Sequence, residues 1–342
     1  MSYAKPPHAS GLRLHFNENT AGCSPAVLEA LRSIGREDVS LYPDYAAITI
    51  ATEQYFGVGR GWVQLTNGLD EGLHVVAQFA GRARETRALV IEPAFEMYAA
   101  CADGVGLRAV HIPPEPDFRF PLDAILAAIG PDTRLVYLTD PNNPTGLAIP
   151  PGAVERVATA APHALVLVDE AYAEFSGRTF IGPALDRHRA LIVGRTFAKA
   201  HGLAALRVGA LIAHPDTLDP LRRILPPYNV NIAAVFALRA ALQDRAYLEW
   251  YVTQSVESKR LIYAFCDRRG FKYWKSDANF VLVRVGAEAA ALTDDLARRG
   301  VLIRDRSRSP GCEGCIRLTA GVVDHTSICL SALEEALASR PH

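Results

Sequence analysis

The sequence predicts an α/β protein in which helices cover both faces of a mostly parallel central sheet, with a smaller α+β domain attached. Short, continuous apolar runs alternate with helical patterns between about residues 60 and 225. After Tyr228 the pattern changes to helices followed by shorter strands. The 342 residues, with 49% hydrophobic and 21% charged side chains, are typical of a soluble globular protein with enough chain for two domains.

The expected strands of the larger domain come first along the chain. They are residues 88–91, 107–110, 135–138, 165–168, 191–193 and 209–212. Runs that are apolar at every position fit strands covered on both faces, as in a parallel sheet.

The expected elements of the smaller domain follow Tyr228. Helical patterns span 233–243 and 246–268, the shorter strands lie near 280–283, 301–303 and 316–318, and a last helix follows. This order predicts an α+β unit.

Lys199 lies in an unusual setting. It follows the apolar run 191–193 in a segment of small residues, and Arg207 comes eight residues later. The chain has only five lysines, so Lys199 does not belong to a crowd of solvated cations. A surface lysine is the ordinary alternative. An amine in this setting nevertheless suits imine formation beside an anion site.

Two expected strands end in polar side chains. Asn143 lies in the turn-forming run after 135–138, while Asp169 ends 165–168 and Tyr172 comes three residues later. In an open α/β sheet, ligands bind at the carboxyl ends of the strands. A carboxylate there can hold a protonated ring nitrogen and a phenol can bond a ring oxygen, so the pair suits a pyridinium ring.

In their order and spacing these motifs resemble fold-type I enzymes of pyridoxal 5'-phosphate (PLP), and the chain is most similar to the histidinol-phosphate aminotransferase family. The resemblance covers nearly the whole chain. Its motifs are 17–19 (NEN), 42–44 (YPD), 67–71 (NGLDE), 93–98 (PAFEMY), 141–146 (PNNPTG) and 169–172 (DEAY), with Arg304 and Arg317.

The resemblance implies roles for the residues around the cofactor ring. Lys199 would bind PLP covalently and later move a proton between substrate and cofactor carbons. Asp169 would keep the pyridine nitrogen protonated, which makes the ring an electron sink. Asn143 and Tyr172 would share the ring's phenolic oxygen, and Phe95 would stack on the ring.

The resemblance also implies a phosphate cradle. The backbone amides of Leu69 and Asp70 at a helix start would bind the cofactor phosphate, together with Thr196 and Arg207. Tyr42 would reach in from a neighbouring subunit, so a homodimer is expected.

The substrate residues implied by the resemblance are arginines and their neighbours. Arg317 and Arg304 match arginines that clamp a substrate anion, although Arg304 is also consistent with a surface cation and Arg306 could substitute for it. Tyr228 matches a tyrosine of the substrate pocket, with a structural turn as the alternative. Asn17 belongs to the N-terminal motif beside the substrate.

Two departures from the family pattern are visible. Ala198 precedes the lysine where a serine is usual, which removes one hydroxyl donor to the phosphate, a loss of about 1.5–3 kcal/mol. Thr20 and Ala21 follow Asn19 where Pro-Tyr is usual, so a phenol that touches substrate is missing. A phosphate would bind less well without that donor, and another amino donor could fit better.

The expected activity is therefore that of a PLP-dependent aminotransferase with a ping-pong cycle, histidinol phosphate as the favoured donor and 2-oxoglutarate as acceptor. The alternatives are an aromatic or other amino acid as donor, or a threonine-phosphate-type PLP decarboxylase. A PLP-sensing regulator would need an N-terminal DNA-binding domain, and fewer than twenty residues precede Asn17.

Domain boundaries and setting complete the expectations. By the resemblance, residues 38–225 form the large PLP-binding domain, and 1–37 with 226–342 form the small one. A net charge of -1 and a pI near 6.8 give no reason to expect nucleic-acid or membrane-surface binding. The absence of a transmembrane-length apolar run or a signal-peptide stretch predicts a cytoplasmic protein.

The six cysteines are scattered, which favours reduced thiols over a disulfide framework. Cys312 and Cys315 have ligand-like spacing but no second pair nearby to complete a zinc site, so no metal is predicted.

Overall fold

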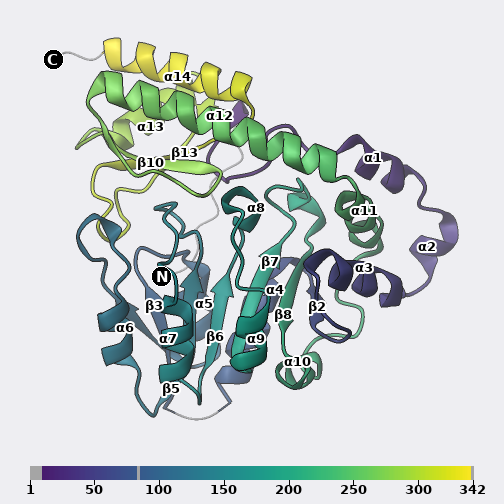
Figure 1. The fold of residues 1–342 in the computed structure, drawn as a ribbon. Helices are drawn as coiled ribbons and strands as arrows, with labels where there is room; N and C mark the ends of the chain where they lie inside the picture. The colour runs from purple at the N-terminus through teal and green to yellow at the C-terminus, as the bar shows by residue number, and fades with distance from the viewer. Residues whose placement is uncertain (1–9, 83–84, 340–342) are drawn as a thin grey trace.

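The computed structural model describes residues 10–82 and 85–339 (Figure 1). The start of the chain, for which the sequence indicates no signal peptide, lies outside the described residues. Within the described part, no helix is both long and apolar enough to cross a membrane.

A seven-stranded sheet forms the centre of the larger part, in the order β2-β8-β7-β6-β5-β3-β4. Its strands are β2 (Val63–Thr66), β3 (Arg87–Ile91), β4 (Arg108–Ile112), β5 (Thr133–Thr139), β6 (Leu165–Asp169), β7 (Leu191–Thr196) and β8 (Gly209–Ala213). The neighbouring strands β4, β3, β5, β6 and β7 are parallel. β8 and β2 are antiparallel to their neighbours. The mostly parallel sheet expected from the sequence is thus confirmed. β2 was not expected, because Gln64 interrupts its short apolar run.

Helices cover both faces of this sheet because alternate strand residues point to opposite sides. On β5, Val136 and Leu138 belong to the core shared with α7 and α11, whereas Leu135 and Tyr137 belong to the core shared with α4 and α5. The helices of this part are α1 (Pro25–Arg32), α2 (Arg36–Ser40), α3 (Ala46–Phe56), α4 (Gly68–Ala80), α5 (Met97–Gly104), α6 (Leu122–Ala128), α7 (Ala153–Ala160), α8 (Ala173–Ser176), α9 (Pro183–Arg187), α10 (Pro215–Arg222) and α11 (Ile232–Gln243).

A smaller antiparallel sheet lies above the carboxyl ends of the large one (Figure 1), in the order β12-β13-β10-β9. Its strands are β9 (Lys272–Tyr273), β10 (Phe280–Arg284), β12 (Arg304–Asp305) and β13 (Cys315–Thr319), and its helices are α12 (Arg245–Arg269), α13 (Ala289–Arg298) and α14 (Val323–Ala338). β1 (Leu12–Arg13) pairs in parallel with β11 (Val301–Leu302), which joins the N-terminal segment to this part.

The helices expected at 233–243 and 246–268 are present as α11 and α12. The side chains of Ala234 and Leu238 on α11 belong to the core of the large sheet, whereas the sequence placed this helix with the smaller domain. The exact domain boundaries, at 37/38 and 225/226, remain a prediction.

Candidate active site

A pocket lies between the carboxyl ends of the parallel strands, the small sheet and the N-terminal segment. All the site residues expected from the sequence line this pocket, except Tyr42 and Tyr228. These side chains come together because β5, β6 and β7 end at the same sheet edge, as the parallel pairing of β5 and β6 requires.

Lys199 lies in the turn after β7, with its side chain in the pocket. Its Nζ donates a hydrogen bond to the carbonyl oxygen of Phe16 at 2.9 Å. Burial, and then the positive charge of Arg317, lower the pKa of Lys199 to about 8. Close to neutral pH, a useful fraction of this amine is therefore uncharged and nucleophilic.

Asp169, the last residue of β6, is buried in the pocket. Its Oδ2 accepts a hydrogen bond from the hydroxyl of Tyr98 at 2.7 Å, and its Oδ1 accepts one from the backbone N–H of Ala171 at 2.9 Å. Burial raises the pKa of Asp169 to about 6 despite these hydrogen bonds. Within residues 10–82 and 85–339, no basic side chain forms an ion pair with it. It is a carboxylate that a cationic ligand group would stabilise.

Tyr98 was missed as a site residue by the sequence reasoning. It lies three residues after Phe95 in the same motif, which could have indicated a second aromatic side chain at the same site. Its hydroxyl contacts Thr139 Oγ1 at 2.9 Å as well as Asp169. Burial, and then the charge of Asp169, raise the pKa of Tyr98 well above its usual value, so the phenol stays protonated as a donor.

The other residues expected around the ring each have a contact within the pocket. The Tyr172 hydroxyl accepts a hydrogen bond from Asn17 Nδ2 at 3.0 Å, and the Lys199 Nζ lies 5.9 Å from the centre of the Tyr172 ring. Asn143 Oδ1 accepts a hydrogen bond from Arg317. The Phe95 ring meets the Tyr98 ring edge-on.

The start of α4 has the form of an anion site. Gly68 has a φ of +72°, a backbone conformation that favours glycine, and a Cβ there would lie 2.5 Å from Arg207 Nη2 and would displace that guanidinium. Arg207 is fixed by Asp70 Oδ2, which accepts from Nη2 at 2.8 Å. The N–H groups of Leu69 and Asp70 belong to the first helical turn, which has no intrahelical acceptors for them. Thr196 also lines the pocket.

Arginines gather on one face of the small sheet. Arg304 lies directly opposite Arg317 in the antiparallel pairing of β12 with β13. Arg306 is two residues beyond Arg304, so alternation places it on the same face, and all three line the pocket. Like charges directly opposite each other destabilise a sheet, and a bound anion would relieve that repulsion.

Arg317 is anchored deeply within this group. It is buried, and its Nη2 donates to the carbonyl oxygen of His15 at 2.7 Å. Burial lowers the pKa of Arg317 to about 10, and the charges of Arg306 and Arg304 act in the same direction. At neutral pH the guanidinium remains charged and available to an anion.

Tyr42 and Tyr228 lie outside the pocket of the single chain. Their rings stack on each other with centroids 4.2 Å apart, and the residues are 78% and 52% exposed. The expected contribution of Tyr228 to the substrate pocket is therefore not formed by its own chain. Leu41 and Val39 are also strongly exposed beside Tyr42 in the sequence.

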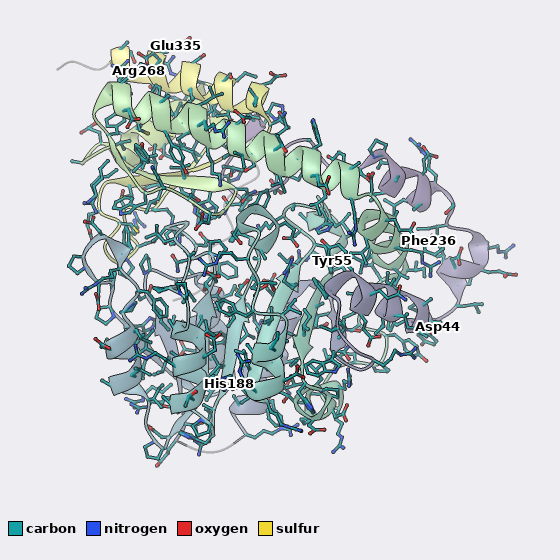
Figure 2. The ribbon with its side chains drawn as sticks, in the orientation of Figure 1. Asp44, Tyr55, His188, Phe236, Arg268 and Glu335 are labelled. Carbon is teal, nitrogen blue, oxygen red and sulfur yellow. The ribbon has the colours of Figure 1, made fainter. Side chains whose placement is uncertain are left out.

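A buried ion-pair cluster adjoins the strand ends that carry the site. Arg195 on β7 pairs with Glu170 at 3.0 Å and also with Glu174. Burial raises the pKa of Glu170 to about 7, although Arg195 opposes this shift. His201 Nε2 lies 3.3 Å from the hydroxyl of Tyr55 on α3, which is labelled in Figure 2. Arg195 precedes Lys199 and His201 follows it, so the cluster has members on both sides of the lysine turn.

Cys312 and Cys315 do not line the pocket. They are buried with Trp274 and Leu282 in a small core of their own.

Comparison with known proteins gives three findings. Residues 9–328 match the family model for aminotransferases of class I and II. The chain is 38% identical to histidinol-phosphate aminotransferase 2 of Ralstonia nicotianae over 337 residues, covering 96% of this chain and 89% of that protein. The structure of histidinol-phosphate aminotransferase from Sinorhizobium meliloti in complex with pyridoxal-5'-phosphate is similar, with a TM-score of 0.85, 29% identity, and 96% and 91% of the two chains covered.

A second solved structure shows the fold alone. It is that of a putative histidinol-phosphate aminotransferase from Erwinia carotovora atroseptica, with a TM-score of 0.87 and 24% identity, covering 97% of this chain and 99% of that one. These likenesses confirm the expected fold, a large domain of fold type I with a smaller α+β part.

Proposed function

Because this chain belongs to the class I and II aminotransferase family, whose members depend on PLP, we propose that it transfers the amino group of histidinol phosphate to 2-oxoglutarate. The observation that supports this choice is the group of three guanidiniums, Arg304, Arg306 and Arg317, in the same pocket as Lys199. Relatives that share most of the chain are histidinol-phosphate aminotransferases.

The residues present fit PLP. Asp169 is a buried carboxylate that lacks a cationic partner among the described residues, which suits a protonated ring nitrogen. The start of α4, kept open by Gly68, suits a phosphate. Lys199 lies in the same pocket with an amine of lowered pKa. Bound PLP supplies a ring that accepts the electron pair left when a substrate C–H bond breaks.

Each side chain around that ring has a definite task. Lys199 would hold the cofactor through its Nζ, and as a free amine it would accept the proton from the substrate carbon. Asp169 holds a proton on the ring nitrogen, and the Tyr98 hydroxyl keeps Asp169 ionised by a charge-assisted hydrogen bond. Tyr172, fixed by Asn17, presents its hydroxyl beside Lys199.

One arginine group serves both substrates in turn. Histidinol phosphate brings a phosphate, and 2-oxoglutarate brings a second carboxylate that reaches the same end of the pocket. A planar guanidinium suits either group. Because a ping-pong cycle binds the two substrates one after the other, a single anion site is enough.

We also propose a homodimer. Tyr42 and Tyr228 form an exposed aromatic pair, and Val39 and Leu41 add further exposed apolar surface. Large exposed apolar groups of this kind mark contact surfaces. In the proposed dimer Tyr42 contributes to the phosphate cradle of the partner subunit.

The test is a single-turnover absorbance measurement on PLP-loaded protein. The protein is mixed separately with histidinol phosphate, phenylalanine, glutamate and threonine phosphate, and the loss of the bound-cofactor band is followed. We expect histidinol phosphate to react at the lowest concentration. Reaction only with phenylalanine would replace the proposed donor and leave the reaction class intact. Release of carbon dioxide from threonine phosphate, without amino transfer, would contradict transamination.

A further inference from the structure

We propose that Arg306, held in place by Glu96, is a specificity-determining residue that binds the phosphate of histidinol phosphate. Glu96 sets the net charge of that site. The inference rests on the proposed function, because it concerns the same pocket. The sequence assigned no role to Glu96. It assigned Arg306 only the role of a possible substitute for Arg304.

The position of Arg306 separates it from the surface arginines of the same segment. Its backbone N–H donates to the carbonyl oxygen of Cys315 at 2.9 Å, so the ladder of β12 with β13 continues through it. Arg306 is only 6% exposed and lines the pocket. Arg308, two residues later, is exposed. Arginine is almost never buried without a partner, so the buried guanidinium of Arg306 needs groups in the pocket that pair with it.

The guanidinium of Arg306 has unused donors. Its Nη1 donates to Glu96 Oε1 at 2.8 Å. Its Nε is buried and has no hydrogen-bond partner in the described part of the chain, and the same is true of Arg317 Nε. A buried donor left unsatisfied costs stability. An oxyanion in the pocket would supply the missing acceptors.

The charges at this end of the pocket leave a surplus that matches a dianion. Arg304, Arg306 and Arg317 carry three positive charges, and Glu96 carries one negative charge, which leaves two positive charges. His15 adds no positive charge near neutral pH, because burial and the neighbouring arginines lower its pKa to about 4. A phosphate monoester carries close to two negative charges.

Glu96 connects this anion site to the cofactor end of the pocket. It immediately precedes α5 and follows Phe95, so the Arg306–Glu96 ion pair links the small sheet to the start of α5 in the larger part. The Glu96 side chain is 40% exposed, in contrast to the buried Arg306. Burial acts to raise the pKa of Glu96, but Arg306 and Arg304 outweigh it and hold the pKa below its usual value. Glu96 is therefore ionised near neutral pH and offsets one charge.

The experiment uses the PLP-loaded enzyme and compares two donors that differ only in the phosphate, histidinol phosphate and histidinol. Single-turnover rates give the half-saturating concentration of each, and inhibition by inorganic phosphate is measured alongside. For Arg306→Met we expect half-saturation by histidinol phosphate to rise on the order of ten- to a hundredfold. The value for histidinol should stay within about threefold, because it lacks the anion.

Glu96→Gln is expected to act in the opposite direction. Glutamine keeps an oxygen that can accept from Arg306, but it removes the negative charge. The half-saturating concentration of histidinol phosphate and the inhibitory concentration of phosphate should then fall several-fold. Arg308→Met is the matched control, with no change expected in either. Arg306→Lys keeps a charge without the planar fork and should lie between wild type and Arg306→Met.

The outcomes separate this inference from the proposed donor. An equal rise for histidinol phosphate and histidinol in Arg306→Met would overturn it, because the residue would then only shape the pocket. An unchanged response in Arg306→Met would also overturn it. If the wild-type enzyme does not react with histidinol phosphate, the proposed donor fails, and phosphate inhibition then decides on Arg306. Inhibition lost in Arg306→Met and retained in Arg308→Met supports its role, and inhibition retained in both refutes it.

Discussion

Tyr98→Phe should make the stability of the cofactor-free protein depend more steeply on pH. The substitution removes the hydroxyl that donates to Asp169 Oδ2 at 2.7 Å. A hydrogen bond to a charged acceptor contributes about 1.5–3 kcal/mol. At about 1.4 kcal/mol per pKa unit, its loss raises the pKa of Asp169 by roughly one to two units above the value of about 6 that it has with this hydrogen bond in place.

The direction of the effect follows from proton linkage. The pKa of Asp169 in the folded protein lies above its usual value of 3.8, so the folded state binds this proton more tightly than the unfolded chain does. The stabilisation is complete below the unfolded pKa and is lost as pH rises through the folded pKa. In wild type that loss is largely complete shortly above pH 6, whereas in Tyr98→Phe it continues to roughly pH 8.

Urea unfolding of the cofactor-free protein at about pH 5 and pH 9 measures this difference. Tyr98→Phe should be destabilised by about 1.5–3 kcal/mol more at the higher pH than at the lower. Tyr137→Phe is the control. The Tyr137 ring stacks on that of Tyr98 at 4.9 Å, and its buried hydroxyl has no hydrogen-bond partner among the described residues. Its substitution should have the same effect at both pH values, and an equally flat response from Tyr98→Phe would refute the reasoning.

Three further substitutions test the pocket and its support. Lys199→Ala should abolish both turnover and the covalent attachment of PLP, and the lost attachment is seen as the absence of a mass increase after borohydride reduction. A variant that still transaminates would contradict the role of Lys199 as the residue that binds PLP. Arg317→Met should raise the half-saturating donor concentration on the order of tenfold or more through loss of a charged hydrogen-bonded contact, measured by single-turnover absorbance; an unaltered response would place the anion clamp elsewhere. Arg195→Met should lower the free energy of unfolding by about 3–5 kcal/mol, because Glu170 and Glu174 remain buried without their partner; urea unfolding within about 1 kcal/mol of wild type would contradict that reasoning.

Much of the fold was predictable from local patterns. Each of the six apolar runs expected in the larger part became a strand, because a run that is apolar on both faces is stable only when it is covered on both sides. Asp169 followed one of these runs directly, and Asn143 lay in the turn after another. Their common location therefore came from strand order alone, since parallel strands end at one sheet edge.

The sequence by itself determined the class of protein, the sheet and the residues that gather at its carboxyl edge. Only the tertiary structure decided which side chains meet there. Tyr98 and Asp169 are 71 residues apart, and Glu96 and Arg306 are 210 apart. Such contacts depend on how helices and sheets pack, which no local periodicity encodes. Tyr42 and Tyr228 show the same limit, because their exposed stack is set by packing at the surface and not by the motifs around them.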